Sequence, residues 1–434
     1  MNVLIVTLGS RGDVQPFVAL GTALRKRGHA VTLCTSDRFA SFAADFDLDF
    51  VPADGALVEL LESDEGKELL EDIRSLWGVM RSTRRLFKRV PRMVHAFLND
   101  VWQAAQAVRP DLIVFGSKGT MASAVAARLG CPAVLVMPLP QLVPTGELPA
   151  IGFPRWPLGP LYNRATHGVV NTVMRLYAGM LNAFRVDTLG LPKARGTAAL
   201  YADLAGRPYP VMHCYSPSIL PRPADWPAHA SVDGFWFLER TDAWQPDARL
   251  ARFLEAGAPP VCVGFGSMAG KHPARVTAAV IAALEAAGAR GVLLTGWGGL
   301  RAGALPDTVH VADSVPHDWL LPRCSAVLHH GGAGTTGAGL RAGKPTLICP
   351  FGLDQPFWGA QVHALGLGPR PVPQRQLRRR GIDQAVADLV GNGAYARRAA
   401  ELATQMAADP TADDAAATLE ALAAAAPRPT GEGR

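Results

Sequence analysis

Short apolar runs alternate with helical stretches along the first half of this chain, and the same alternation starts again in the second half. Alternating strands and helices fold into parallel sheets covered by helices on both faces. The chain is therefore predicted to be an α/β protein of two Rossmann-like domains, each a doubly wound parallel sheet, with the active site in the cleft between them. The predicted strands are residues 3–7, 30–34, 112–115 and 133–137, with a helix at 16–27, and then residues 261–265, 292–295, 309–312, 326–328 and 346–349.

The length of the chain supports two domains, because 434 residues exceed what one hydrophobic core usually fills. Residues 216–242 begin with a proline-rich stretch and are predicted to link the domains. The domains themselves are expected at residues 1–215 and 243–423. Residues 424–434 are mostly Ala, Pro and Gly without an apolar period, so they are predicted to be disordered.

Composition narrows the class of protein. No apolar run reaches the roughly 18 residues that cross a bilayer, and the first residues lack the basic region and cleavage site of a signal peptide, so we expect a cytoplasmic protein. The six cysteines have no Cys-x-x-Cys spacing, which predicts reduced core residues and no metal site. The formal net charge of +6 fits anionic substrates or an acidic membrane surface. Nucleic acid is not an expected partner, because no basic stripe is interleaved with aromatic residues.

The most informative motif, His-His-Gly-Gly-Ala-Gly-Thr-Thr, follows the predicted strand 326–328. Its glycines allow a tight turn with unobstructed amides, and a helical stretch comes next. Because the N-terminus of a helix binds anions, a diphosphate is the expected ligand. A capped helix after a glycine-rich turn is the alternative interpretation. The candidate ligand-binding residues are His330, Gly332, Gly334, Thr335 and Thr336.

A second polar pair, Asp354 and Gln355, follows the next predicted strand. Parallel α/β sheets hold their ligands at the carboxyl ends of the strands. A carboxylate accepts hydrogen bonds, and an amide both donates and accepts them, which suits the hydroxyls of a sugar. Together the two loops predict a site for a sugar joined to a diphosphate, where fixed donors stabilise the charge on the leaving group without a metal.

These motifs make the sequence resemble the family 1 glycosyltransferases of the GT-B fold, in particular the branch of sterol glucosyltransferases and antibiotic-biosynthesis glycosyltransferases. The resemblance covers nearly the whole chain and rests on Gly-Ser-Arg-Gly-Asp-Val-Gln-Pro at residues 9–16, Gly-Phe-Gly-Ser at 264–267 and the signature from His330 to Gln355. It implies inverting transfer of a sugar from a nucleotide diphosphate to a hydroxyl, with no metal or other cofactor. It also implies that the first domain binds the acceptor and the second the nucleotide sugar.

The loop after the first predicted strand carries Ser10, Arg11, Gly12 and Asp13, and is expected to approach both the donor diphosphate and the acceptor. Asp13 is the candidate general base that deprotonates the acceptor hydroxyl. Many plant relatives use a histidine here, held by an acidic partner, and this loop has none. An N-cap of a helix beginning after Asp13 is the alternative, and both roles can coexist. For Arg11, pairing with a phosphate and simple solvation are equally open.

The resemblance assigns two further donor contacts. It implies that Ser267 touches a donor phosphate. It also implies that the segment of Val315 meets the uracil or thymine base through backbone groups and stacking. Gly-x-Gly alone occurs widely, so the first of these depends on the resemblance and not on the pattern.

Acceptor choice is expected to come from the proline-rich loop 138–162, whose apolar residues include Phe153 and Trp156. Long loops beside sites often act as lids, so this loop predicts a hydrophobic acceptor such as a sterol, terpenoid, polyketide or flavonoid. Ordinary packing onto the domain explains the same residues. Residues 81–93 mix cations with large apolar side chains, which suggests either peripheral membrane contact or a solvated helix face.

Several alternative functions stay open. The donor is UDP-glucose or a TDP-deoxysugar, and Asp354 with Gln355 favours glucose, because a deoxysugar leaves polar groups unpaired at about 1–3 kcal/mol each. A sugar-nucleotide epimerase of this fold would need acid and base groups around the sugar. A noncatalytic nucleotide-binding protein would need no base at residue 13. An oxidoreductase is disfavoured, because neither domain has an intact Gly-x-Gly-x-x-Gly followed by an acidic residue about twenty positions later.

Overall fold

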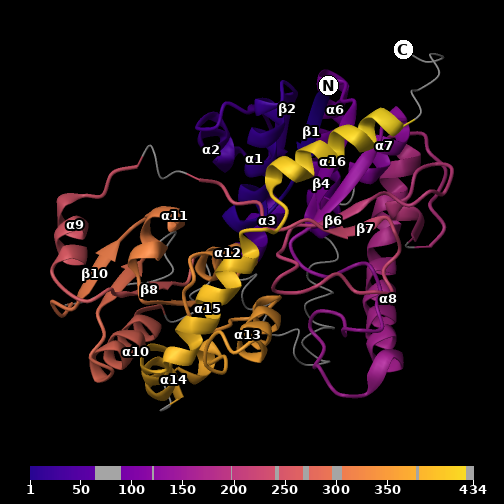
Figure 1. Cartoon of the computed structure of the whole chain (residues 1–434). Coiled ribbons are helices and arrows are strands. Elements are labelled where there is room, and N and C mark those ends of the chain that lie inside the picture. The colour runs from indigo at the N-terminus through magenta and orange to yellow at the C-terminus, as the bar shows by residue number, and fades with distance from the viewer. Residues whose placement is uncertain are drawn as a thin grey trace. The chain divides into compact units, whose positions relative to one another are not determined.

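A computed structural model describes residues 1–63, 89–119, 122–196, 198–239, 244–266, 273–295, 305–377 and 381–426. These residues form two compact units, each built around its own parallel sheet (Figure 1). The predicted α/β class with two parallel-sheet domains is confirmed.

Unit 1 contains a seven-stranded parallel sheet within the described residues, in the order β3-β2-β1-β4-β5-β6-β7. The strands predicted in the first half of the chain are confirmed. The strands β3, β6 and β7 are not predicted, because each is short and includes a polar residue or proline, so none forms a continuous apolar run. The strands are β1 (Asn2–Val6), β2 (Ala30–Thr35), β3 (Asp49–Pro52), β4 (Leu112–Gly116), β5 (Ala133–Met137), β6 (Val211–His213) and β7 (Ala230–Val232).

Helices cover both faces of the unit 1 sheet. In β1, Val3 and Ile5 belong to the core cluster that includes α1 and α16, while Leu4 and Val6 belong to the cluster that includes α6 and α7. Burial on both faces explains why the strand is apolar at nearly every position. The main helices are α1 (Arg11–Lys26), α2 (Ala40–Ala44), α3 (Ala56–Glu62), α6 (Val90–Val108), α7 (Ala122–Leu129), α8 (Gly159–Asp187) and α16 (Ala412–Ala425).

Unit 2 contains a five-stranded parallel sheet within the described residues, in the order β10-β9-β8-β11-β12, and all five strands are predicted. They are β8 (Val261–Gly264), β9 (Gly291–Leu294), β10 (Val309–Ala312), β11 (Ala326–His329) and β12 (Thr346–Ile348). The helices are α9 (Ala248–Glu255), α10 (Pro273–Ala286), α11 (His317–Leu320), α12 (Ala333–Arg341), α13 (Gln355–Ala364), α14 (Gly381–Gly391) and α15 (Gly393–Met406).

The chain crosses between the units differently from the expected linker at 216–242. Tyr215–Pro221 belongs to unit 2, whereas Arg222–Leu238 returns to unit 1. Hydrogen bonds explain the first assignment, because Ser218 Oγ donates to Asp409 at 2.6 Å and Gln361 Nε2 donates to the carbonyl of Ile219 at 2.8 Å. Strand pairing explains the second, because β7 lies beside β6 at the edge of the unit 1 sheet.

The C-terminal helix also returns to unit 1, which corrects the expectation that residues 243–423 form one domain. Helix α16 packs on α1 (Figure 1), where Ala416 and Leu419 are fully buried. Glu420 accepts from Arg27 at 2.5 Å and from His29 at 2.6 Å. Residues 424 and 425, which were expected in a disordered tail, complete this helix, and residues 427–434 lie outside the described part of the chain.

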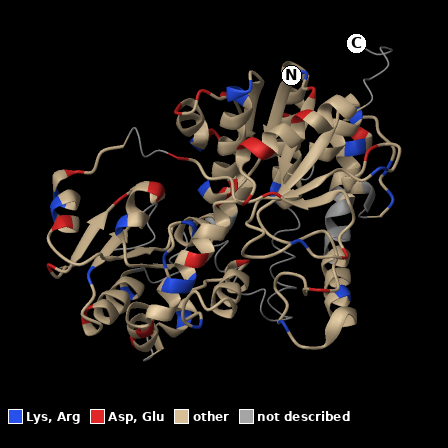
Figure 2. Ribbon diagram, viewed as in Figure 1, with Lys and Arg blue, Asp and Glu red and all other residues tan. Residues whose placement is uncertain are grey.

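In the portion of the chain that the structure describes, every helix is too short or too polar to cross a membrane. Figure 2 shows acidic and basic residues interspersed along the ribbons of both units.

Candidate active site

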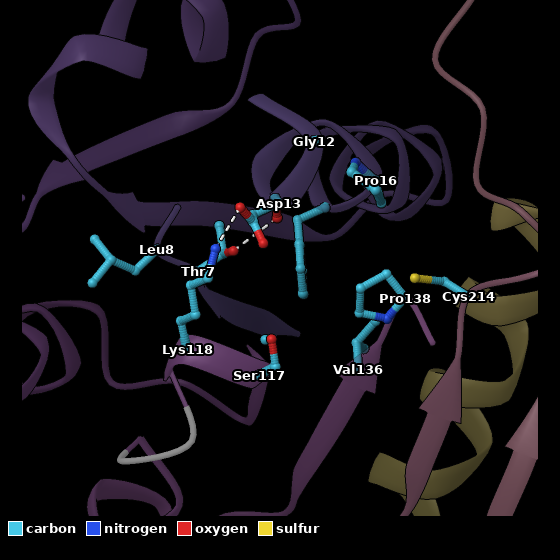
Figure 3. A pocket seen from close by; sticks show the side chains of 12 residues that line it. Thr7, Leu8, Gly12, Asp13, Pro16, Ser117, Lys118, Val136, Pro138 and Cys214 are labelled. Atoms are coloured by element: carbon cyan, nitrogen blue, oxygen red, sulfur yellow. Dashed lines mark hydrogen bonds and ion pairs between the residues drawn. The ribbon is translucent and has the colours of Figure 1, made fainter. Parts of the chain in front are cut away.

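A small pocket lies at the carboxyl ends of β1 and β4 in unit 1 (Figure 3). These strands are neighbours in the sheet, so the loops that follow them meet. The cavity has a volume of about 10 Å³, which is room for about one water. Within unit 1 this pocket is therefore too small for a substrate, and its interest lies in the polar side chains that line it. The residues that line it include Thr7, Asp13, Ser117, Lys118, Pro138 and Cys214.

The Asp13 carboxylate is held through one oxygen only. Its Oδ2 accepts from the amide and the hydroxyl of Ser10, at 2.8 and 3.0 Å, and from Lys118 Nζ at 2.7 Å. Within the described residues, no hydrogen bond reaches Oδ1. Asp13 thus presents a free oxygen from a fixed carboxylate, which is what a general base needs.

Helix α1 begins earlier than predicted, and this corrects the alternative role of Asp13. The N-cap is Ser10, and Asp13 is the third residue of the helix, where its carboxylate accepts from the N-cap amide. A carboxylate in the first turn also interacts favourably with the helix dipole. Asp13 therefore helps to start the helix, but not as the N-cap.

Gly9 makes room for the Asp13 carboxylate. Its φ is +147°, and a Cβ at this position would lie 2.2 Å from Asp13 Oδ2. The turn is also held from the other side, because Thr7 Oγ1 donates to the carbonyl of Asp13 at 2.9 Å. Any other residue at position 9 would displace the carboxylate from its donors.

Lys118 is the residue of this site that sequence reasoning missed. It lies in a 3₁₀ turn (Ser117–Gly119) directly after β4, and its ammonium pairs with Asp13 across 105 residues of sequence. The signal was the position of a cation at the carboxyl end of a predicted strand. Its use required knowing that β4 lies beside β1.

The other residues of the first loop contact unit 1 itself. Arg11 lies over the ring of Phe42, 5.0 Å from its centroid, and its Nε donates to Gln15 at 3.1 Å. Gly12 is exposed in the first turn of α1, and the Ser10 hydroxyl is bonded to Asp13. Contacts of Ser10, Arg11 and Gly12 with the donor stay predictions.

In unit 2, the predicted strand, glycine turn and helix are confirmed as β11, residues 330–332 and α12. Gly331 has a φ of +99°, and a Cβ there would lie 2.6 Å from Ile348 Cγ2 and 3.1 Å from the carbonyl oxygen of Gln355. The turn thus requires glycine and lies against the loop after β12. Gly332 precedes the helix, and the amides of its first turn, including those of Gly334 and Thr335, point out of its N-terminus.

His330 is a neutral histidine beside this turn. Burial lowers the pKa of its imidazole to about 4, aided by the nearby His317 and opposed by a hydrogen bond with the backbone of Gly264. A Cβ at Gly332 would lie 2.8 Å from His330 Nε2, so the glycine makes room for the ring. A neutral imidazole has one proton to donate, and the Gly264 backbone competes for it, so the predicted contact of His330 with a phosphate stays a hypothesis.

The two threonines of the motif differ. Thr336 is fully buried, and its hydroxyl donates to the carbonyl of Gly332 at 2.9 Å. This corrects its predicted use as a hydroxyl donor to a phosphate, because the proton already has a partner inside the helix. Thr335 is half-buried in the first turn of α12 and keeps the predicted role as a hypothesis.

Gln355 holds its own loop. Its side chain is 3% exposed, and Oε1 accepts from the amides of Phe351 at 2.7 Å and Gly352 at 3.4 Å. The predicted accepting role of this amide toward a sugar is therefore already filled, which leaves only its NH₂ group. Asp354 is half-buried directly before α13 and remains the candidate acceptor of hydrogen bonds from a sugar.

Two further residues, Ser267 and Val315, are predicted from the sequence to contact the nucleotide sugar. Ser267 lies outside the described residues. Val315 is 6% exposed in a core cluster with Leu320, so a contact with a base would have to use its backbone.

The predicted acceptor loop is shorter than expected, because α8 begins at Gly159. The amide of Ala150 donates to Thr166 Oγ1, and Asn163 Nδ2 donates to the carbonyl of Gly146, both at 2.8 Å. These bonds tie the loop to α8. Phe153 is half-buried, but Trp156 is 58% exposed and stacks on Tyr162 with ring centroids 5.7 Å apart. An apolar tip is thus exposed, and its role in acceptor binding stays a prediction.

A larger cavity of about 690 Å³ lies in unit 1 beside β3, α3 and α6. Its lining mixes charged and apolar residues, which differs from the apolar acceptor surface that the sequence predicts. Four carboxylates line it, those of Asp37, Asp54, Glu59 and Asp100. Of the basic segment 81–93, residues 81–88 lie outside the described part of the chain, so its proposed membrane contact stays a prediction.

Two family models match the chain. The model described as glycosyltransferase family 28 N-terminal domain matches residues 3–126. The model described as erythromycin biosynthesis protein CIII-like, C-terminal domain, matches residues 278–422.

Among curated proteins, the chain is 33% identical over 426 residues to O-mycaminosyltylonolide 6-deoxyallosyltransferase of Streptomyces fradiae, covering 97% of each protein. It is also 33% identical over 404 residues to sterol 3-beta-glucosyltransferase UGT80A2 of Arabidopsis thaliana, covering 89% of this chain but 60% of the plant protein. The chain therefore spans less than two thirds of the length of such sterol glucosyltransferases.

Solved structures share the fold at low identity. The glycotransferase of kitacinnamycin aligns with a TM-score of 0.71 and 20% identity, covering 97% of this chain and 98% of that one. Spinosyn rhamnosyltransferase SpnG complexed with thymidine diphosphate aligns with a TM-score of 0.65 and 21% identity, covering 97% and 100%.

Proposed function

The chain belongs to the family 1 glycosyltransferases of the GT-B fold, and on that premise we propose that it moves a sugar from a nucleotide diphosphate to a hydroxyl of a hydrophobic acceptor. The preferred donor is UDP-glucose, and the transfer inverts the anomeric carbon without a metal. The acceptor is a sterol, terpenoid, polyketide or flavonoid.

The observation that carries this proposal is the clamped carboxylate of Asp13. Ser10 and Lys118 bind Oδ2 and leave Oδ1 to accept a proton. In the proposed step the acceptor oxygen bonds to the anomeric carbon as the bond from that carbon to the diphosphate breaks. The acceptor proton passes to Asp13 Oδ1, and the electron pair leaves with the nucleoside diphosphate. A single displacement of this kind inverts the centre.

Unit 2 supplies donors for the leaving group. The first-turn amides of α12 bind a diphosphate whose negative charge grows during the step, and His330 adds a hydrogen bond when its N–H turns from the Gly264 backbone to the phosphate. Fixed dipoles of this kind perform the task that a divalent cation performs in other transferases. This is the basis for proposing a metal-independent reaction.

A transferase for a TDP-deoxysugar is the second candidate, and two observations favour it. The relative from Streptomyces fradiae, which matches along 97% of its length, is by name a 6-deoxyallosyltransferase. In addition, Gln355 Oε1 is already bonded to the loop, so fewer acceptors would lose a partner when a sugar lacks a hydroxyl. The preference for glucose then depends on Asp354 and on the sterol glucosyltransferase relatives.

The first experiment incubates the purified chain without metal, with UDP-glucose or TDP-glucose. Acceptors are pooled sterols, flavonoids and macrolides, including amine-bearing macrolides because of the four carboxylates in the larger cavity. Mass spectrometry reads the products. A hexose adduct that appears with one donor and resists chelator supports the proposal, whereas activity only after a divalent metal is added rejects the metal-independent mechanism.

Donor binding without any adduct would move the assignment to the deoxysugar transferase or the epimerase. Conversion of the sugar nucleotide to its epimer, followed by NMR, separates these two. Failure of both UDP and TDP to bind would reject the proposed donor class.

A further inference from the structure

His329, the last residue of β11, is fully buried and plays no part in the reaction proposed above. The amide of Gly331 donates to its Nδ1 at 3.0 Å. A ring nitrogen that accepts a hydrogen bond carries no proton, so the neutral ring has its proton on Nε2. Burial lowers the pKa of this imidazole well below its ordinary value, with a smaller contribution from the neighbouring His330 and His317. His329 is therefore neutral.

The Nε2–H group of His329 has no hydrogen-bond partner within the described residues. His329 lies on the same face of β11 as Val327, which belongs to an apolar cluster that includes Cys262 and Leu320. Burying an unpaired donor is unfavourable, and an aliphatic side chain of similar volume would avoid it. The unpaired donor thus makes a histidine destabilising at this position. The hydrogen bond that Nδ1 accepts from Gly331 N–H compensates for that loss.

That bond closes the turn on which the donor site depends. It joins the residues on either side of His330 and fixes the backbone at Gly331, whose φ of +99° leaves few alternatives. The direction of the His330 ring and the position of Gly332 at the start of α12 follow from this turn. Loss of the hydrogen bond at Nδ1 would therefore displace both groups that are proposed to bind the diphosphate, the His330 ring and the first-turn amides of α12.

We propose that His329 is a positioning residue for the donor diphosphate, acting through the Gly331 amide and not by contact with the ligand. From the sequence alone, only the second histidine of the motif, His330, is predicted to lie in the site. The inference rests on the proposed function, because it assumes that a nucleoside diphosphate binds at this turn.

Two substitutions separate positioning from packing. In His329→Asn, Oδ1 is attached to Cγ as Nδ1 is in histidine, so it can accept from Gly331 N–H, while the Nδ2 amide group replaces the unpaired Nε2–H as a buried donor. In His329→Leu the side chain fills the space but accepts nothing. His310→Leu is the matched control, since His310 lies in the same sheet but in β10, which β9 and β8 separate from β11, and its ring centroid lies 5.4 Å from that of Phe253.

Binding of UDP and of TDP, measured separately by calorimetry, is the first measurement. His329→Leu is expected to lower the affinity for whichever of UDP and TDP binds more tightly by about tenfold. The affinities of His329→Asn and His310→Leu are expected to stay within about threefold of that of the unchanged protein. Thermal unfolding of His329→Leu is expected close to the original temperature, because the change removes the unpaired Nε2–H but leaves Gly331 N–H without its acceptor. Wild-type affinity in His329→Leu would overturn the proposal. So would a loss of affinity that follows a loss of stability equally in the Leu and Asn variants.

Hydrogen exchange of peptides spanning 326–341, without ligand, tests the turn independently of donor binding. Exchange at Gly331 is expected to accelerate in His329→Leu and to return to the original rate in His329→Asn. Unchanged exchange in the Leu variant would overturn the positioning role. If the unchanged protein binds neither UDP nor TDP, the proposed function fails, and this exchange result alone decides whether His329 holds the turn.

Discussion

The segment from β1 to α1 in unit 1 and the segment from β11 to α12 in unit 2 share one backbone plan but differ in charge. Each has a buried strand, a turn with a positive-φ glycine and a helix, and the two glycines are Gly9 and Gly331. The first turn presents the carboxylate of Asp13, held by side-chain donors that include a lysine. The second presents backbone amides and a neutral histidine, His330.

This difference shows how one local scaffold can serve opposite chemistry. In unit 1 the glycine makes space for a side chain, since a Cβ at Gly9 would strike Asp13. In unit 2 it makes space for the turn itself, since a Cβ at Gly331 would strike Ile348. A base and an anion site therefore need the same strand and helix but different packing around the turn.

The sharpest test of the contrast is Asp13→Asn. General bases contribute about 10²–10⁴-fold, so kcat/KM is expected to fall by that factor, while affinity for UDP or TDP, which depends on unit 2, changes little. Steady-state kinetics and calorimetry measure the two quantities. Asp49→Asn, at the exposed start of β3, is the control. Near-full activity in Asp13→Asn would remove Asp13 as the base.

Leu419→Ala tests whether unit 1 depends on the C-terminal helix. Leu419 is fully buried between α16 and the unit 1 core, so its truncation is expected to cost roughly 2–5 kcal/mol. Hydrogen exchange during denaturant unfolding should show the loss in unit 1 only. Leu402→Ala, in α15 of unit 2, should show the reverse. Identical loss in both units from either variant would contradict the division of the chain.

His330→Ala should weaken both donor binding and transfer, unlike the change at Asp13. A hydrogen bond to a charged group is worth about 1.5–3 kcal/mol, which corresponds to roughly tenfold to hundredfold in affinity. Titration with UDP and TDP and the turnover rate give the two readings. A lower turnover with unchanged affinity would mean that His330 acts only in the transition state.

Lys118→Met should have a smaller effect. The ion pair with Asp13 is partly exposed, with side-chain exposures of 45% and 23%, and such pairs are worth about 1 kcal/mol or less. Turnover is expected to fall by no more than about tenfold, with partial recovery in Lys118→Arg. Lys26→Met, at the end of α1, is the control. Equal turnover in the Met variant and the unchanged protein would show that Ser10 alone orients the carboxylate.

The smallest expected effect is an opposite contribution of His330 in unit 2 and Asp233 in unit 1 to the pH dependence of stability. The pKa of His330 falls from 6.5 to about 4 on folding, so its contribution to stability is present above pH 6.5 and is lost as the pH falls toward 4. Burial raises the pKa of Asp233 in unit 1 from 3.8 to about 6, against opposing hydrogen bonds with Ser231 and the backbone of His213. Its contribution is present below pH 3.8 and is lost as the pH rises toward 6.

Denaturant unfolding followed by unit-resolved hydrogen exchange between pH 4 and 6.5 measures this response. Each pKa unit corresponds to about 1.4 kcal/mol, and Asp233→Asn should make the slope of stability against pH more positive in unit 1 only. An unchanged slope of unit 1 in Asp233→Asn would contradict the pKa shift assigned to Asp233.

Much of the candidate site was predictable because it is local. Strand, turn and helix are contiguous in both motifs, and the glycines that need positive φ are visible in the sequence. The functions of Gln355 and Thr336 were less predictable, because each bonds to backbone within four residues and so withdraws a polar group from any ligand. A polar residue in a motif can bind a substrate or hold its own loop, and the sequence does not distinguish these uses.

The sequence by itself determined the α/β class, nine of the described strands and the glycine turn before α12, because the apolar period and backbone strain act over a few residues. Only the tertiary structure decided which distant groups meet. Lys118 reaches Asp13 across 105 residues because β4 lies beside β1, and Glu420 reaches Arg27 across 393 residues because α16 covers the apolar face of α1. Such partners depend on strand order and helix packing, which no local stretch of sequence specifies.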